Sequence, residues 1–211
     1  MLKKRIITAV IGIPILLLAV YFGGWALVAP VMFLAGIAAD EYFKLLYLMK
    51  CKHKLVYGLL GVVYIAVGFL AFVGLRLQSP NWQQALLLLF TVWVTDTGAF
   101  EIGRRFGKHK MAPTISPNKS WEGAVGGLLV ALLIAGGYAV SALGINIMMG
   151  LLIVAIGSVA GQIGDLIESK VKRLAGVKDS GSLFPGHGGV LDRFDSILLA
   201  SPVVYLLLQL A

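Results

Sequence analysis

Apolar runs about as long as a bilayer is thick recur along the whole chain of 211 residues, and they limit the folds open to it. A helix that spans a bilayer needs roughly 20 consecutive apolar residues, and a soluble core gives no reason for that length to repeat. The residues are 59% hydrophobic and 13% charged, whereas an average soluble domain has about 25% charged residues. We therefore expect an all-α, polytopic integral membrane protein.

Seven apolar runs predict about seven transmembrane helices, the first of them retained and not cleaved as a leader. The runs cover residues 6–22, 25–39, 56–75, 84–100, 123–141, 145–165 and 197–211. Short turns alternate along the chain with three longer polar loops, 40–55, 101–122 and 166–196. We expect one membrane-embedded domain over residues 1–211, with the catalytic part roughly at 95–196.

The basic residues are distributed unevenly between the two sides of this arrangement. Three lie at the amino end, four in loop 40–55, five in loop 101–122 and five in loop 166–196, which leaves Arg76 alone on the other side. Lys and Arg favour the cytoplasmic loops of membrane proteins. We therefore expect a multi-pass protein of the cell inner (plasma) membrane, with the amino terminus and the active site cytoplasmic. The net charge of +8 then suits the anionic lipid bilayer and not nucleic acid.

The ten acidic residues lie in the same loops or at the inner ends of the runs. Five of them fall within 31 residues, at Asp165, Glu168, Asp179, Asp192 and Asp195. Carboxylates this close would repel one another beside lipid unless cations lay between them, and oxygen ligands favour a hard cation such as Mg²⁺. An ordinary charged rim at the helix ends is the alternative.

Basic residues alternate with these acids, which suits a phosphate-bearing ligand held by cations on both sides. They are Lys172, Arg173, Lys178 and Arg193. The segment Phe184 to Gly189, FPGHGG, comes just before the last apolar run. Glycine backbones there can turn N–H groups toward phosphate oxygens, and such a turn before a helix start is an anion site. We expect His187 to contact a phosphate or ribose.

Asp96 lies inside the inner end of an apolar run, where an ionisable residue is costly and usually functional. The alternative is a helix-end residue that reaches the membrane interface. Asp96 therefore marks a second candidate part of the site, separate along the chain from the acidic cluster.

The segment SPNKSWEG follows Asp96 by about 20 residues and carries a more specific pattern. Ser116 and Pro117 predict a turn, and Lys119 is a cation suited to phosphate. Ser120 and Glu122 predict the cap of the next helix.

Both segments resemble the cytoplasmic loops of phosphatidate cytidylyltransferases, also called CDP-diglyceride synthases. Every fixed position of the family signature is filled across 27 residues, by Ser169, Lys172, Arg173, Lys178, Asp179, Pro185, His187, Gly188, Gly189, Asp192, Arg193 and Asp195. The resemblance implies a membrane enzyme that transfers the cytidylyl group of CTP to phosphatidic acid. Its products would be CDP-diacylglycerol, for phospholipid biosynthesis, and pyrophosphate.

The chain departs from the family pattern at three points. Phe100 stands where the family commonly has Tyr, and Ser120 where Thr is common. The chain is also shorter than the better-known bacterial members, chiefly in its amino-terminal half.

The resemblance assigns roles to residues of both segments. Mg²⁺ is the expected cofactor, with a second cation left open, and its expected ligands are Asp165, Asp192 and Asp195. The same three residues and Lys178 are the expected catalytic residues. Contacts with CTP and phosphatidic acid are expected from Asp96, Ser116, Lys119, Lys172, Arg173, His187, Gly188, Gly189 and Arg193.

Two other functions stay open at this point. A related cytidylyltransferase could act on another lipid phosphate, such as an archaeal ether lipid or a polyprenyl phosphate. A cation transporter would also use intramembrane carboxylates, although only Asp96 and Asp165 come near the required depth. A homodimer is left open as well.

Overall fold

The computed structural model describes residues 2–78, 82–184, 186 and 188–211, with only the backbone described at residues 2–7 and 9. This part of the chain forms seven helices and one two-stranded antiparallel hairpin. Their bounds are α1 (Leu2–Phe22), α2 (Gly24–Leu48), α3 (Lys54–Leu77), α4 (Gln83–Phe106), β1 (Lys110–Ala112), β2 (Ser116–Ser120), α5 (Trp121–Leu143), α6 (Ile147–Leu174) and α7 (Leu191–Leu208). The predicted helical membrane fold is confirmed.

Three helices extend well past the apolar runs that predicted them. Helix α2 continues to Leu48, α4 to Phe106 and α6 to Leu174. Polar residues that continue a helix beyond the apolar layer carry no hydropathy signal, so the runs stop short of the helix ends. The loops between these helices are therefore shorter in the structure than the sequence predicted. Most charged residues assigned to loop 166–196 lie on α6 or α7.

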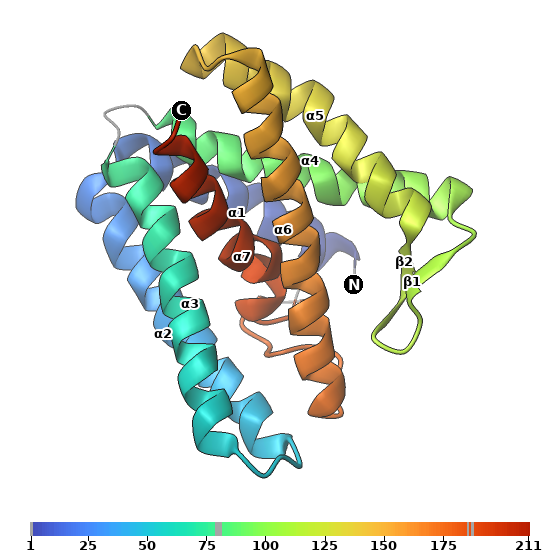
Figure 1. Cartoon of the computed structure of the whole chain (residues 1–211). Coiled ribbons are helices and arrows are strands. Elements are labelled where there is room, and N and C mark those ends of the chain that lie inside the picture. Colours follow the sequence, from blue (N-terminus) through green and yellow to red (C-terminus); the bar gives the residue numbers. More distant parts are fainter. Residues whose placement is uncertain (1, 79–81, 185, 187) are drawn as a thin grey trace.

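The connections that Figure 1 shows clearly lie on two sides of the molecule. The α5–α6 connection and the carboxyl terminus lie at the top of Figure 1, whereas the α2–α3 and α6–α7 connections lie at the bottom. The hairpin projects from the ends of α4 and α5 in the lower right of the same view. The α2–α3 and α6–α7 connections therefore lie away from the α5–α6 connection, and the side of the membrane that each faces stays a prediction.

Five helices, α2 to α6, are each long and apolar enough to cross a bilayer among the described residues. The apolar part of α1, Val10–Phe22, is shorter. Large apolar side chains remain exposed along these helices, for example Leu59 on α3 and Leu133 on α5, which suits contact with lipid chains. The chain is a multi-pass membrane protein.

Helices α4 and α5 pack backbone to backbone through glycine. A Cβ atom at Gly127 of α5 would lie 2.5 Å from the carbonyl oxygen of Thr95 on α4. A Cβ atom at Gly123, one turn earlier on α5, would lie 2.7 Å from the carbonyl oxygen of Ala99. Small residues are typical of membrane helix contacts, because lipid chains leave little hydrophobic drive for association and close packing must supply it. This contact fixes the base from which the hairpin projects.

Arg76, the basic residue assigned to the opposite side, caps the end of α1. Its Nε donates a hydrogen bond to the carbonyl oxygen of Val20 at 2.7 Å, and its Nη2 donates to that of Tyr21 at 3.1 Å. The last carbonyl groups of a helix lack partners within the helix, and a cation suits their partial negative charge. Arg76 therefore ties α3 to α1 on the side away from the acidic cluster.

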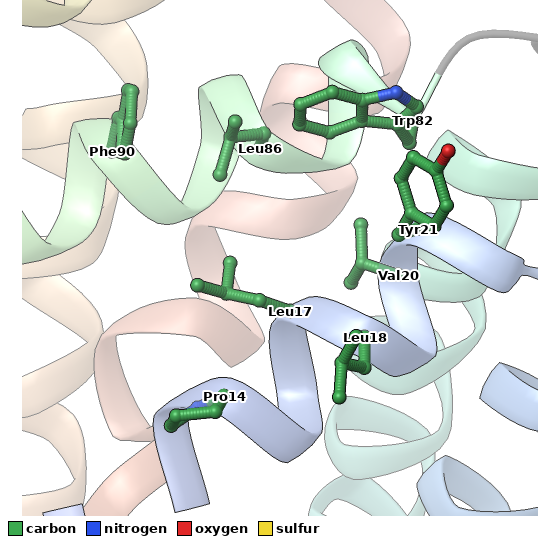
Figure 2. A pocket seen from close by; sticks show the side chains of 8 residues that line it. All are labelled: Pro14, Leu17, Leu18, Val20, Tyr21, Trp82, Leu86 and Phe90. Atoms are coloured by element: carbon green, nitrogen blue, oxygen red, sulfur yellow. The ribbon is translucent and has the colours of Figure 1, made fainter. Parts of the chain in front are cut away.

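An apolar groove lies between α1 and the start of α4. Figure 2 shows the side chains that line it, which are Pro14, Leu17, Leu18, Val20, Tyr21, Trp82, Leu86 and Phe90. None of these eight residues is charged. The groove therefore offers no group that would bind a triphosphate, and the candidate site is found elsewhere.

We predict that Gly127→Ala lowers the thermal stability of the purified protein in detergent. The added methyl group must push α5 away from α4, at a cost of about 1–3 kcal/mol. Gly137→Ala is the matched control on the same helix, because a Cβ atom there meets nothing within 4 Å. Equal melting temperatures for the two variants would contradict the close packing of α4 and α5.

Candidate active site

The polar ends of α6 and α7 meet at a glycine. A Cβ atom at Gly164 of α6 would lie 2.5 Å from the carbonyl oxygen of Asp195 on α7, so the two helices cross closely there. Asp165 follows this glycine directly. Asp195 lies within electrostatic range of Asp165, Glu168 and Asp96. The crossing therefore gathers carboxylates from α4, α6 and α7 in one region.

The hairpin brings a cation to this region. Lys119 of β2 forms an ion pair with Asp165, with 2.6 Å between Nζ and Oδ2, and both side chains are about a quarter exposed. Asp165 also accepts a hydrogen bond from Ser169 Oγ at 3.2 Å. Asp96 lies within electrostatic range of both Asp165 and Lys119. The two segments singled out in the sequence are thus parts of one site.

A second, more deeply buried group of charges surrounds Lys172. Its Nζ lies 2.5 Å from Glu168 Oε2 and 2.5 Å from Asp192 Oδ1, and the three side chains are 11%, 6% and 4% exposed. The other oxygen of Asp192 accepts hydrogen bonds from the backbone N–H groups of Ser180 and Gly189, each at 2.8 Å. Buried charges are tolerated only when they are paired and hydrogen-bonded in this way. The start of α7 is therefore fixed to α6 by a cation between two carboxylates.

Arg173, expected to bind substrate, contacts backbone in this structure. Its Nε donates to the carbonyl oxygen of Ile115 at 3.1 Å, and its Nη1 donates to that of Val177 at 2.9 Å. The first contact reaches the turn of the hairpin and the second the loop after α6. Arg173 therefore links the two segments of the site, and a contact with substrate stays a prediction.

The other expected basic contacts lie at the surface of this region. Lys178 is exposed on the loop after α6, and Arg193 is exposed on the first turn of α7. Arg193 is within electrostatic range of Asp96. Ser116 is half-buried at the start of β2, where it pairs with Ala112.

The glycine-rich segment adopts the backbone conformation that only glycine favours. Gly188 has φ of +87°, and a side chain there would overlap the carboxylate of Asp192. The N–H groups of Gly189, Val190 and Leu191 donate to carboxylates of the protein itself. A phosphate contact by Gly188 or Gly189 stays a prediction, and His187, like Pro185, lies outside the described residues.

Two polar residues of the amino-terminal half lie near the site and were not singled out in the sequence. Glu41 of α2 is 4% exposed and accepts hydrogen bonds from the start of α7. The hydroxyl of Tyr64 on α3 lies next to Gly164 and has no hydrogen-bond partner among the described residues. Both come from the amino-terminal half, and neither has a spacing in the sequence that relates it to the acidic cluster.

Oxygen ligands for a divalent cation are present but are not gathered into one set. In the part of the chain that the structure describes, no three acidic, histidine or cysteine side chains converge on one metal position. Asp192 is held by the buried charges, whereas Asp165 and Asp195 lie together near Asp96. Neither buried oxygen of Glu168 accepts a hydrogen bond from the described residues, and Oε2 is engaged by the ion pair with Lys172, so Oε1 is unused. Such oxygens fit Mg²⁺, and the predicted ligand set stays a prediction.

Comparison with known proteins identifies the family. The profile of the Cytidylyltransferase family matches residues 3–78 and 48–211, which together cover almost the whole chain. The chain belongs to the cytidylyltransferase family. The family resemblance seen in the two polar segments is thereby confirmed.

Relatives of this cytidylyltransferase in staphylococci carry a more specific name. A phosphatidate cytidylyltransferase of Staphylococcus epidermidis is 41% identical over 181 residues, covering 83% of this chain and 69% of the relative. One of Staphylococcus haemolyticus is 40% identical over 185 residues, with the same coverage. One of Staphylococcus aureus is 39% identical over 205 residues, covering 94% of this chain and 76% of the relative.

We predict that Lys172→Met strongly lowers the thermal stability of this cytidylyltransferase in detergent. Glu168 and Asp192 would stay buried without their shared cation, at a cost of about 3–5 kcal/mol. Lys170→Met is the control, because Lys170 is exposed on the same helix. If Lys172→Met melts at the temperature of Lys170→Met, the buried ion pairs do not hold α6 and α7 together.

Proposed function

We propose that the protein transfers the cytidylyl group of CTP to phosphatidic acid at the membrane surface, giving CDP-diacylglycerol and pyrophosphate. The observation that carries this proposal is the meeting of acidic and basic side chains from α4, α6, α7 and the hairpin, in a chain of this family. The names of the staphylococcal relatives support this pair of substrates over an ether lipid, a polyprenyl phosphate or cation transport.

The proposed metal ligands are Asp165, Asp192 and Asp195, and Asp96 adds negative charge beside them. Mg²⁺, when bound, would screen the phosphates of CTP and polarise the phosphorus that is attacked. A second cation is compatible with the number of carboxylates. Tethering these acids to the ends of three packed helices keeps them in place before substrate arrives.

Lys119 and Lys172 suit different tasks because they differ in burial. The pair between Lys119 and Asp165 is partly exposed, and such pairs contribute only about 0–1 kcal/mol, so Lys119 can exchange its partner for a phosphate oxygen of CTP at little cost. Lys172 is enclosed between two carboxylates. We assign Lys172 to positioning Asp192, and the substrate contact to Lys119.

The chemical step needs no protein nucleophile. The phosphate of phosphatidic acid is ionised at neutral pH, so one of its oxygens can attack the α-phosphorus of CTP directly. The bond from the α-phosphorus to the bridging oxygen breaks, and pyrophosphate leaves with the electron pair. Lys178 and Arg193, which are both exposed, would neutralise the charge that gathers on the leaving group.

The location of the reaction follows from the two-sided arrangement of the helices. The acidic residues and nearly all basic residues belong to one side, which we assign to the cytoplasmic face of the plasma membrane by the preference of Lys and Arg for that side. CTP would then reach the site from the cytoplasm, and phosphatidic acid from the adjoining leaflet. A homodimer stays a prediction.

We predict that Asp165→Asn and Asp192→Asn each lower the formation of CDP-diacylglycerol at least about 100-fold, because metal stabilisation of the transition state contributes several kcal/mol. The assay uses purified protein in detergent with CTP, Mg²⁺ and phosphatidic acid. Glu101→Gln is the control, since Glu101 forms only exposed ion pairs with Arg104 and Arg105. Near-normal turnover in both Asp variants would refute the metal assignment.

The same assay with other acceptors tests the substrate. Replacing phosphatidic acid by an ether-lipid phosphate or a polyprenyl phosphate should remove most of the product. A wild-type protein that uses either acceptor better than phosphatidic acid, or that makes no cytidylylated lipid at all, would refute the proposed function itself.

A further inference from the structure

We infer that Glu41 on α2 is a positioning residue of the active site, holding the start of α7 and, through Ser180, the carboxylate of Asp192. The inference rests on the proposed function, because it assigns Glu41 a role in the same reaction. It extends the site beyond the predicted catalytic part, residues 95–196, into the amino-terminal half of the chain.

Glu41 caps α7 from another helix. Its Oε1 accepts a hydrogen bond from the N–H group of Val190 at 2.9 Å, and its Oε2 accepts one from that of Leu191 at 3.0 Å. Helix α7 has no side-chain cap of its own. The first N–H groups of a helix lack partners within the helix and carry partial positive charge, so a carboxylate is a favourable partner. Glu41 therefore supplies the side-chain cap that no residue next to Val190 provides.

Ser180 connects Glu41 to Asp192. Its Oγ lies 3.0 Å from Glu41 Oε2 and 2.9 Å from Asp192 Oδ2. A hydroxyl carries one proton, so the two carboxylates share a single donor and hold it between them. Because the N–H group of Ser180 also donates to Asp192, the loop residue is fixed at two points. Glu41 therefore limits where Asp192 can lie.

The loop is shaped to receive this carboxylate. A side chain at Gly181 or at Gly189 would overlap the carboxylate of Glu41. Neither glycine has a positive φ, so close approach to Glu41 is the reason that the structure gives for glycine at these positions. Two loop glycines thus leave space for one buried carboxylate, and this fit indicates a specific role for Glu41.

Burial gives the contact its strength. Glu41 is 4% exposed, whereas its neighbour Asp40 is exposed and forms only a surface ion pair with Lys44. A buried carboxylate needs hydrogen-bond donors, and among the described residues the donors to Glu41 all come from the segment 180–191. Loss of the Glu41 carboxylate would therefore leave hydrogen-bond donors of this segment without their acceptor.

The test compares Glu41→Gln with Asp40→Asn in purified protein. Glu41→Gln keeps the size of the side chain but turns an amide N–H₂ toward a backbone donor. We expect its kcat to fall by about tenfold to a hundredfold, as for other groups that orient metal ligands, while the KM for CTP changes less than about threefold. Glu41→Asp, which keeps the charge with a shorter reach, should recover part of kcat. Asp40→Asn should match wild type.

Hydrogen exchange supplies a readout that does not depend on turnover. In Glu41→Gln we expect the amide of Val190 or that of Leu191 to exchange about tenfold faster or more, because the glutamine side chain keeps an acceptor oxygen for only one of the two. Asp40→Asn should leave these amides unchanged. If wild-type protein makes no cytidylylated lipid, the proposed function fails, and the exchange result still decides whether Glu41 holds the start of α7.

Two results would overturn the inference. One is a kcat for Glu41→Gln within about twofold of Asp40→Asn, since orienting groups are worth more than that. The other is unchanged exchange at Val190 and Leu191. If Glu41→Gln does not fold, Ser180→Ala takes its place, because it removes the hydroxyl shared with Asp192 and leaves both backbone contacts of Glu41. An unchanged kcat in that variant would equally overturn the inference.

Discussion

The structure depends on the neutralisation of carboxylates where α6 and α7 cross. Gly164 lets the two backbones approach, and that approach brings Asp165 and Asp195 together beside the apolar layer. Charges so close to lipid must be paired or screened. Lys172 of α6 pairs with the neighbouring carboxylates of Glu168 and Asp192, and Lys119 of the hairpin pairs with Asp165. The position of the hairpin and the start of α7 both follow from this requirement.

Burial divides these charges into two groups with different freedom. The group around Lys172 is enclosed, with each buried charge paired, and it acts as a fixed joint between helices. The group around Asp165, with Lys119 and Asp96, is more accessible, so its ion pair can be replaced by phosphate and metal. A site that binds a highly charged nucleotide beside lipid needs both properties: rigid support, and charges that can change partners.

The sequence predicted those features that depend on neighbouring residues. The length of the apolar runs predicted seven helices, and Ser120 caps α5 by accepting from the N–H group of Gly123, as its pattern indicated. Contacts between segments that are distant in the sequence could not be predicted from such local patterns. Glu41 lies about 150 residues from Leu191, its partner, and no spacing rule relates the two. The hairpin was missed because its polar residues lack the alternation of a half-buried strand.

The central claim is that carboxylates from the crossing of α6 and α7 hold the cation that accompanies CTP. The most direct measurement is the anomalous scattering of Mn²⁺, substituted for Mg²⁺, in crystals of the protein grown with CTP. The account predicts a peak within bonding distance of carboxylate oxygens of Asp165 and Asp195. A peak bound only to residues away from this crossing, with CTP in place, would contradict it.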